Sequence, residues 1–383
     1  MSTQFVTAES VTEGHPDKLC DQIADGILDA CLAQDPLSRV AVEALVCGDT
    51  LVIAGEITTT ADIDVAATAR DVIRDIGYSD PALGFDADGC LILTNLRTQS
   101  PDIDRGVSLG EELGAGDQGV FYGYACDETP CRMPAAIHLA HRLAVRLAAA
   151  RKGGTLPWLR PDGKTQVTLR CDDDGRPVEI SSLVMSAQHD ERVGREELVR
   201  GLVEAVILPE VGGLLAPDAR ILVNPTGRFV VGGPAADTGL TGRKLMVDSY
   251  GGCAHHGGGA FSGKDATKVD RSAAYMARLI AKTVVVAGLA TKCEVALAFA
   301  IGESLPEMVT IGTFGTGSVD ADRLSMAVRN VFPLSVSGMI AALGLRRPIF
   351  RPTAAYGHFG REEQGFRWEL TDQAAALRAA CGL

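Results

Sequence analysis

Hydrophobic and polar residues follow two periods along this chain, one typical of helices and one typical of strands. Residues 16–34 place apolar side chains at helical spacing behind Pro16, which predicts an amphipathic helix. Residues 39–59 contain two apolar runs around a Gly-Asp turn, which predicts an antiparallel hairpin. A second amphipathic helix is expected to begin near Asp62, followed by a strand over about residues 90–95.

The remainder of the chain repeats this mixture of elements. Helices are expected at about 132–151, 193–207 and 269–288, and strands at about 166–171, 177–186, 219–225, 293–300 and 308–313. Three blocks that each join hairpins to helices favour an α+β fold of three similar-sized units over one parallel α/β sheet. No repeat is visible at the level of residues, so internal symmetry would have to reside in the fold.

One long segment, residues 100–119, is rich in Gly, Asp and Ser and has few apolar side chains. A loop of this length inside a compact domain is typical either of an active-site lid or of disorder. Residues 100–113 are therefore expected to be either a mobile active-site lid or a disordered segment, and a lid should be cut by proteases near Arg105 unless bound ligands close it. The domains expected around it are an N-terminal domain at 1–99, a central domain at 114–230 and a C-terminal domain at 231–383.

The composition is that of an ordinary soluble globular protein, with 46% hydrophobic and 22% charged residues in a chain of 383. A net charge of −13 disfavours a broad nucleic-acid surface. The longest apolar run, near residues 283–290, is far shorter than the roughly 20 residues that a membrane span needs, and the N-terminus lacks a secretory signal pattern. We therefore expect a cytoplasmic protein with no nucleic-acid or membrane partner. Ten scattered cysteines without a CxxC pair are expected to be free, mostly buried thiols.

Basic charge is concentrated in residues 226–282, which carry eight Lys or Arg against four Asp. The first 38 residues of this segment hold 11 glycines. Because glycine lets backbone N–H groups approach a phosphate closely, the segment predicts a polyphosphate site. The run from Gly258 to Lys264 comes close to a P-loop, but Asp265 stands where Ser or Thr would bind magnesium, so a true P-loop is disfavoured. A glycine-rich loop without a ligand is the structural alternative.

Two carboxylates near helix starts have both a structural and a functional interpretation. Asp17, beside His15 in GHPDK, either complements the dipole of the helix that starts there or holds Mg²⁺ bound to phosphate oxygens. Asp270 of KVDRS is either a salt-bridge hub or a second magnesium ligand.

For five further carboxylates, the interpretation depends on whether the side chain is exposed to water or buried. Asp21, Asp25 and Asp29 continue the i, i+4 row that begins in GHPDK, and we expect them to form a solvated helix face. Glu43 and Glu56 stand in strands whose pattern suggests burial. A buried carboxylate is costly unless it is paired or bound to a cation, so both are also functional candidates.

Six segments in order carry a resemblance to a known family: GHPDK, GEITT, GAGDQG, NPTGRFVVGGP, GLTGRK and GGGAFSGKD. Together they closely resemble S-adenosylmethionine synthetase (methionine adenosyltransferase), and the match runs from about residue 5 to the C-terminal TAAYGHFGRE. The resemblance implies three structurally similar α+β domains in a pseudo-threefold arrangement. It also implies a homodimer with shared active sites, and two dimers that pair into a homotetramer.

The resemblance further implies roles for individual residues. The implied ATP-binding set is His15, Asp162, Lys164, Arg228, Phe229, Asp237, Arg243, Lys244, Ala260 and Lys264, of which His15, Lys164, Arg243 and Lys264 would be catalytic. Phe229 would stack on adenine. L-Methionine would be positioned by Glu56, Gln99, Asp117, Asp237 and Lys268. Asp17 and Asp270 would each hold one of two Mg²⁺ ions per active site, and Glu43 and Ser262 would bind K⁺.

The implied reaction makes S-adenosylmethionine from ATP and L-methionine. The methionine sulfur attacks C5′ of ATP, the triphosphate leaves, and the enzyme then hydrolyses it to phosphate and pyrophosphate. No protein nucleophile is required, so catalysis depends on aligning sulfur with C5′ and on neutralising charge on the leaving oxygen.

The chain departs from the family pattern at NLRTQS, which ends beside the expected lid, and at AIGESLPEM. Neither departure removes an implied ligand. Two other functions remain open from the sequence: an ATP-dependent phosphotransferase that uses the same basic loop, and a catalytically silent relative with a binding role. The intact charged positions argue against the silent relative, and a kinase would yield ADP.

Overall fold

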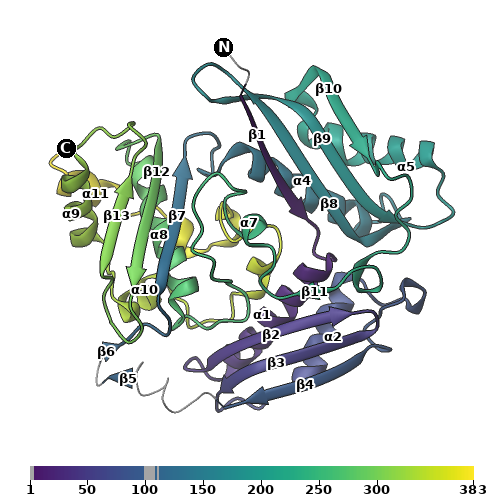
Figure 1. The fold of residues 1–383 in the computed structure, drawn as a ribbon, viewed down its shortest axis with the longest axis horizontal. Helices are drawn as coiled ribbons and strands as arrows, with labels where there is room; N and C mark the ends of the chain where they lie inside the picture. The colour runs from purple at the N-terminus through teal and green to yellow at the C-terminus, as the bar shows by residue number, and fades with distance from the viewer. Residues whose placement is uncertain (1–3, 99–107, 110–111) are drawn as a thin grey trace.

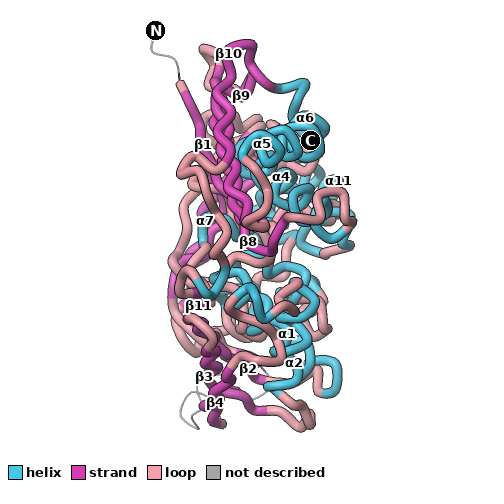
Figure 2. Tube along the Cα trace, turned by 90° about the vertical axis from the view of Figure 1, so that its right-hand side faces the viewer, coloured by secondary structure: helices cyan, strands magenta, loops and turns pink. Residues whose placement is uncertain are grey.

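The computed structural model describes residues 4–98, 108–109 and 112–383, in which helices pack against three larger β-sheets (Figure 1). Seen from the side, strands lie along one face of the molecule and helices along the other (Figure 2). Gln99, Arg105 and most of the expected lid lie outside the described residues.

The first sheet joins the start of the chain to its middle. Its strands lie in the order β1 (Phe5–Val11), β8 (Leu159–Cys171), β9 (Pro177–His189) and β10 (Leu215–Val223). The pair β9–β10 is parallel and the other two pairs are antiparallel. Helix α4 (Ala135–Lys152) packs on β1 and β8, and the helical segment before β10 comprises α5 (Arg195–Leu202), a π-helical turn (Val203–Ile207) and α6 (Leu208–Val211).

The second sheet has the order β11 (Gly239–Leu240), β2 (Arg39–Cys47), β3 (Thr50–Thr58) and β4 (Leu91–Arg97). Again the last pair is parallel and the others are antiparallel. Helix α1 (Pro16–Gln34) packs against β2, β11 and α2 (Val65–Ile76). Helix α2 begins where the Asp64 carboxylate accepts the Ala67 N–H at 2.9 Å, and it ends at Gly77, whose left-handed backbone suits glycine.

The third sheet is antiparallel, with the order β13 (Met308–Gly312), β12 (Lys292–Phe299) and β7 (Gly119–Cys126). Helix α8 (Val269–Val286) packs on β7 and β12, and α9 (Ala321–Val331) packs on β13. The remaining elements are α7 (Leu245–Asp248), α10 (Val336–Leu343), α11 (Ala374–Ala380) and the short pair β5 (Ser108–Leu109) and β6 (Glu112–Leu113). Short 3₁₀ turns cover Pro81–Leu83, Gly212–Leu214, Gly233–Ala235, Arg351–Ala354, Glu362–Gln364 and Arg367–Glu369.

The three units share one element order and exchange their first strands in a cycle. Each unit reads strand, helix, hairpin, helix: β1, α1 and β2–β3 with α2, then β7, α4 and β8–β9 with α5, then β11, α8 and β12–β13 with α9. However, β1 pairs with β8, β7 with β12, and β11 with β2. Every unit therefore gives its first strand to the next, which produces a pseudo-threefold arrangement and confirms the expected α+β fold of three similar domains.

The elements expected from periodicity are largely confirmed. Helix α1 has the expected bounds, the hairpin β2–β3 is antiparallel, and β4, α4, α8, β12 and β13 fall within a few residues of expectation. Strands β8 and β9 are longer than expected. Strands β1 and β7 were not expected, because neither has a hairpin partner next to it in the chain.

The prediction that Glu43 and Glu56 lie in buried strands is wrong for a single copy of the chain. In β2 the even-numbered side chains face α1 and are buried, whereas Glu43 and Leu45 lie on the opposite, open face. Glu56 of β3 is also exposed. The alternation that a half-buried strand requires puts these carboxylates on the strand-lined surface of the molecule.

All ten cysteines lie within the described residues and none forms a disulfide, as expected, and seven of them are buried. Among the described residues no single helix is long and apolar enough to cross a bilayer. Only α9 and α10 together reach such a length and composition, and they are bent by 73° relative to each other.

Candidate functional site

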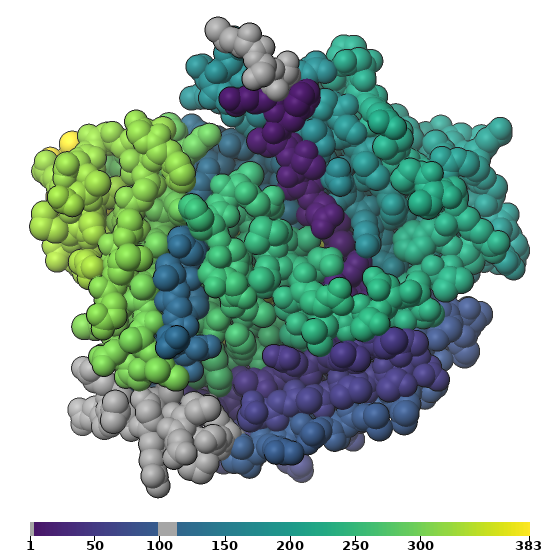
Figure 3. All heavy atoms as spheres, in the orientation of Figure 1, coloured from purple at the N-terminus to yellow at the C-terminus, as the bar shows by residue number. Residues whose placement is uncertain are grey.

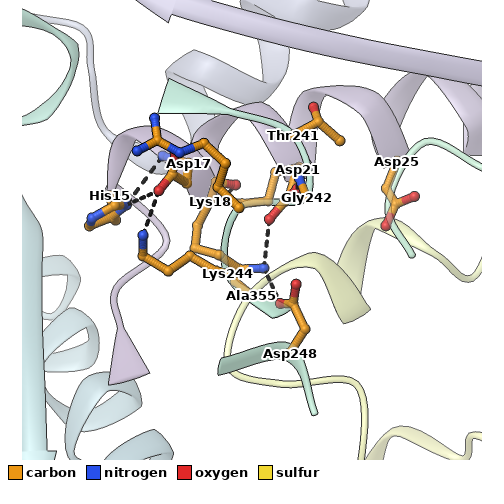
Figure 4. Close-up of polar contacts among 12 residues, drawn as sticks. His15, Asp17, Lys18, Asp21, Asp25, Thr241, Gly242, Lys244, Asp248 and Ala355 are labelled. Atoms are coloured by element: carbon orange, nitrogen blue, oxygen red, sulfur yellow. Dashed lines mark hydrogen bonds and ion pairs between the residues drawn. The ribbon is translucent and has the colours of Figure 1, made fainter. Parts of the chain in front are cut away.

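The site begins at the connection between β1 and α1. His15 is the N-cap of α1, and its Nδ1 accepts the backbone N–H of Asp17 at 3.2 Å (Figure 4). Burial, followed by the charges of Lys244 and Lys164, lowers the pKa of His15 to about 3. The imidazole is therefore neutral at physiological pH. Since Nδ1 acts as an acceptor, the ring proton is on Nε2, which makes His15 an uncharged hydrogen-bond donor.

Asp17 joins α1 to the segment after β11. Its Oδ1 accepts the Leu240 N–H at 3.0 Å, and its Oδ2 accepts from Lys244 Nζ at 2.5 Å. Arg243 Nε lies 3.7 Å from Oδ1. Burial acts to raise the pKa of Asp17, but the Lys244 ammonium and the Leu240 N–H outweigh it and hold that pKa below its usual value. The carboxylate stays ionised beside the Lys244 and Arg243 side chains.

The row of aspartates that follows on α1 is not the solvated face that the sequence suggested. Asp21 and Asp25 are fully buried, and each accepts a backbone N–H of the glycine-rich segment, from Gly242 at 2.8 Å and from Gly263 at 2.8 Å. Asp29 accepts from the backbone of residues 350 and 351. The i, i+4 spacing places one carboxylate per turn on the face that the C-terminal third of the chain covers.

Buried ion pairs partly compensate the charge of this row. Lys18 Nζ donates to Asp21 Oδ2 at 2.8 Å and also to Asp248 of α7. Arg271 of α8 donates two hydrogen bonds to the Asp25 carboxylate, at 2.7 and 2.9 Å, and both side chains are fully buried. Lys18 and Asp248 were not predicted from the sequence, and Arg271, expected beside Asp270, pairs with Asp25 instead. The available signal was the i, i+3 pairing of Lys18 with an aspartate on the same helix.

A second charged cluster lies at the start of α8. Lys264 Nζ is 3.2 Å from Asp270 Oδ2, in ion-pair contact but without a hydrogen bond, so this buried oxygen has no hydrogen-bond partner. Burial raises the pKa of Asp270, the Lys264 charge opposes that shift, and Asp117 adds to it. A Cβ on Gly259 would come within 1.8 Å of Asp270 Oδ1, so only glycine lets the loop backbone pass this close to the carboxylate.

A third group lies on β8 and the adjoining loop after β10. Asp162 is buried, its Oδ2 accepts the Gly233 N–H at 2.9 Å, and its Oδ1 has no partner. Burial raises the pKa of Asp162 to about 6, opposed by the Gly233 N–H, and the charge of exposed Asp237 contributes to the rise. Lys164, two residues along β8, is exposed and lies opposite Val11 of β1.

Phe229 lies beside this group. Its backbone exchanges hydrogen bonds with His189, and its ring is half-buried, close to Gly232. Arg228 is exposed and pairs with Glu191 at 3.2 Å. A half-exposed ring held by its own backbone is available for stacking on a planar ligand.

The other expected site residues have less direct connections. Lys268 is tied to Asp265 at 2.5 Å, Ala260 packs against Gly242, and Ser262 has a buried Oγ without a partner. Glu43 and Glu56 lie on the open sheet face. In the described part of the chain, no three His, Cys, Asp or Glu side chains converge as an all-protein metal site. The structure thus brings His15, Asp17, Arg243 and Lys244 together, and Lys264 with Asp270, around the helix starts of α1 and α8.

Comparison with known proteins decides the family. Models of the N-terminal, central and C-terminal domains of S-adenosylmethionine synthetase match residues 3–101, 112–229 and 231–370. The chain belongs to the S-adenosylmethionine synthetase family. Similar curated relatives include S-adenosylmethionine synthase 1 of Rhodospirillum rubrum, 74% identical over 383 residues, and S-adenosylmethionine synthase 1 of Rhodopseudomonas palustris, 71% identical over 381 residues. Each alignment covers 100% of both chains.

A more distant relative, S-adenosylmethionine synthase of Desulforudis audaxviator, is 54% identical over 392 residues, with 99% of both chains covered. These matches confirm the resemblance read from the six sequence segments. They also fit the three-domain architecture, because the boundaries of the family models fall near the expected domain boundaries. The domain limits and the roles of individual residues stay predictions.

Proposed function

We propose that this chain is a methionine adenosyltransferase, which makes S-adenosylmethionine from ATP and L-methionine by attack of sulfur on C5′ and then hydrolyses the triphosphate to phosphate and pyrophosphate. One observation carries the proposal beyond family membership. A buried, neutral His15 stands at the N-terminus of α1 beside Asp17, Lys244, Arg243 and Lys164. A helix start surrounded by cations is suited to a polyphosphate leaving group.

The chain's own residues supply charge neutralisation and orientation. His15 donates Nε2–H to the oxygen that leaves C5′, because its Nδ1 accepts the Asp17 N–H and so leaves the ring proton on Nε2. Lys164, Arg243 and Lys264 neutralise the phosphates as charge builds on them. Lys244 contributes to the same field while it is held by Asp17. Since these groups are already in place before the reaction, little reorganisation is needed.

Two carboxylates fit the Mg²⁺ ions that the family implies. The buried Asp270 Oδ2 is compensated in the described residues by the Lys264 ammonium at 3.2 Å, and its second lone pair is available to a metal cation. Asp17 already accepts from Leu240 and Lys244, but each carboxylate oxygen has a second lone pair. Magnesium usually binds through one or two carboxylates plus phosphate oxygens, which agrees with separated aspartates rather than a protein cage. When bound, the ions would neutralise triphosphate charge.

We also propose that Ser262 and Glu43 hold K⁺. The Ser262 Oγ is buried without a partner. The next residue, Gly263, accepts the Val42 N–H at 3.0 Å, so the serine segment runs beside the strand that carries Glu43. A buried hydroxyl without a partner and a nearby carboxylate are oxygen donors of the kind that a monovalent cation needs.

The remaining site residues divide between the two substrates. Phe229 stacks on adenine beside Arg228, and Asp162 and Ala260 complete the nucleotide site. The unpartnered Asp162 Oδ1 supports this assignment, because it is free to accept a hydrogen bond from the nucleotide. Methionine is positioned by Glu56, Gln99, Asp117, Asp237 and Lys268.

A second copy of the chain fits the open face of the sheets. In the second sheet Leu45, Val52 and Leu93 stand side by side on three strands, and Leu45 and Leu93 are 38% and 48% exposed. Figure 3 shows most of the N-terminal part of the chain, in purple and blue, along the lower edge of this face of the molecule. Exposed leucines in one row favour burial by a partner. Because Glu43 and Glu56 lie on the same face, a homodimer would place them at its interface and would allow shared active sites. We propose that two such dimers form a homotetramer, and that the enzyme works in the cytoplasm, where free thiols are stable.

Product identity tests this proposal. Purified protein with ATP, L-methionine, Mg²⁺ and K⁺ should yield S-adenosylmethionine, phosphate and pyrophosphate, detected by mass spectrometry and phosphate assays. Omission of Mg²⁺ should abolish the product, and omission of K⁺ should lower the rate. Formation of ADP without S-adenosylmethionine would instead identify a phosphotransferase, and no turnover with intact ATP binding would identify a silent relative.

A further inference from the structure

A cavity on the helix-lined side of the molecule has no role in the proposed reaction. Its volume is about 570 Å³, and it lies between α4, Glu210 of α6 and the loop that follows residue 355. Figure 2 shows α4 and α6 on the side opposite to the strands. Pockets for small ligands typically have volumes of about 300–1,000 Å³, so the cavity is large enough for an aromatic ring with an acidic group.

The cavity has one cationic wall and one apolar wall. Arg142 and Arg146 of α4 share one carboxylate, Glu210. Arg361 and Glu363 also line the cavity and lie 4.0 Å apart, so the lining carries three guanidinium groups against two carboxylates. The guanidinium groups of Arg142 and Arg146 remain accessible, with side chains 53% and 40% exposed. Val145, on the same helix and 46% exposed, lines the cavity together with Tyr356. A small anion with an apolar body matches this arrangement.

A buried histidine fixes one wall of the cavity. His141 is 7% exposed, its Nδ1 is hydrogen-bonded to Ser10 Oγ at 2.8 Å, and the Val247 backbone is a further hydrogen-bond partner of its ring. The wall is therefore tied to β1 through Ser10. In addition, Tyr356 has a backbone φ of 66°, which is strained for a bulky side chain. Strain of this kind concentrates at ligand sites.

The same wall contacts the segment that carries His15. The Tyr356 hydroxyl accepts the Glu13 N–H at 3.3 Å, and the Glu13 carboxylate binds Arg151 at the end of α4 at 2.7 Å. Ser10, held by His141, lies on β1 just before this segment. A ligand that shifts α4 or Tyr356 therefore acts on Ser10 of β1 and on Glu13, two residues before the N-cap of α1.

We propose that this cavity is a second, regulatory ligand site for a small amphipathic anion, with an aromatic or aliphatic body and one carboxylate or phosphate, and that its occupancy changes ATP use through Tyr356 and Glu13. Binding does not depend on the proposed function. The regulatory part rests on it, because it requires turnover as a readout.

The test uses the full chain and two probes, phenyl phosphate and 3-phenylpropionate, with phenol as the uncharged control, in isothermal titration calorimetry. We expect one site per chain for at least one acidic probe and no detectable binding of phenol. Val145→Trp should fill the cavity and abolish binding, and Arg142→Gln should weaken binding at least tenfold. The matched controls Met326→Trp and Arg329→Gln, at exposed positions of α9, should bind as the wild type does.

Several outcomes would overturn the proposal. Absence of binding of both probes, or binding that Val145→Trp leaves unchanged and a non-hydrolysable ATP analogue displaces, would place the anion elsewhere. A change of oligomeric mass in Val145→Trp by light scattering would make the cavity an interface between copies. If the probe binds in the cavity but leaves KM for ATP and kcat unchanged in an active wild-type enzyme, the regulatory part is wrong. If no S-adenosylmethionine forms at all, the proposed function fails while the binding result stands.

Discussion

Replacing Asp25 by Asn should destabilise the protein far more than the loss of a surface charge. Asp25 and Arg271 are both fully buried and share two hydrogen bonds of 2.7 and 2.9 Å. Asp25→Asn leaves the Arg271 charge buried without a counter-charge, and removal of one partner from such a pair typically costs about 3–5 kcal/mol. This is a large share of the roughly 5–15 kcal/mol by which a domain is stable.

The same substitution should also weaken the nucleotide site. Asp25 Oδ1 accepts the Gly263 N–H at 2.8 Å, and Gly263 precedes Lys264. Loss of the Asp25–Arg271 ion pair loosens the loop that carries Lys264. KM for ATP should therefore rise as the stability falls. Urea unfolding followed by circular dichroism, at a fixed protein concentration because of oligomerisation, measures the first effect, and steady-state kinetics measures the second.

Two further variants make the experiment decisive. Asp88→Asn breaks an exposed pair with Arg74, whose side chains are 80% and 45% exposed, and should leave both stability and KM unchanged. The double variant Asp25→Asn with Arg271→Met removes both charges and should recover part of the lost stability. If Asp25→Asn is within about 1 kcal/mol of the wild type, the pair contributes little and the reasoning from desolvation is refuted.

Three other outcomes follow from the site. Asp17→Asn and Asp270→Asn should each lower kcat by orders of magnitude with an unchanged circular dichroism spectrum, and near-normal turnover in either would make that carboxylate structural. Phe229→Ala should raise KM for ATP more than it lowers kcat, whereas an unchanged ATP dependence would place the ring in the core. Burial lowers the pKa of His141 to about 3 in the folded protein. Below the pKa of about 6.5 that this group has in the unfolded chain, the unfolded chain binds one proton more than the folded protein, so the free energy of unfolding decreases as the pH is lowered. His141→Gln should therefore reduce the slope of unfolding free energy against pH by about 1.4 kcal/mol per unit between about pH 4 and 6, and an unchanged slope would contradict the buried neutral state.

Local periodicity was sufficient to predict the elements that pair with their neighbours. Helix α1 begins and ends at the expected residues because Pro16 starts it and its apolar row is continuous. The hairpin β2–β3 follows from a turn between two apolar runs. Strand β1, in contrast, pairs with β8 more than 150 residues away, and no local pattern specifies a partner at that distance.

The surroundings of the acidic side chains could not be predicted from one strand or helix at a time. On α1 the aspartates read as a polar face, and only the tertiary structure supplies the backbone N–H groups of Gly242 and Gly263 that bury them. Glu43 shows the opposite error: an apolar strand suggested burial, but one face of its sheet is open. In both cases the sequence identified the chemistry of the side chain, and the fold determined whether water or protein surrounds it.

The cyclic exchange of strands explains why the site depends on the whole chain. His15 and Asp17 come from the first unit, Lys164 from the second and Lys244 from the third. Strand β1, which leads to His15, is paired with β8, which carries Lys164, and β11, which leads to Lys244, is paired with β2 beside α1. The second unit therefore holds the strand that leads to His15 of the first, and the first holds the strand that leads to Lys244 of the third. In the absence of ligand these basic groups repel one another, and backbone pairing and Asp17 keep them together. The free energy of this repulsion is therefore taken from folding and not from substrate binding, and the site is preorganised for an anion.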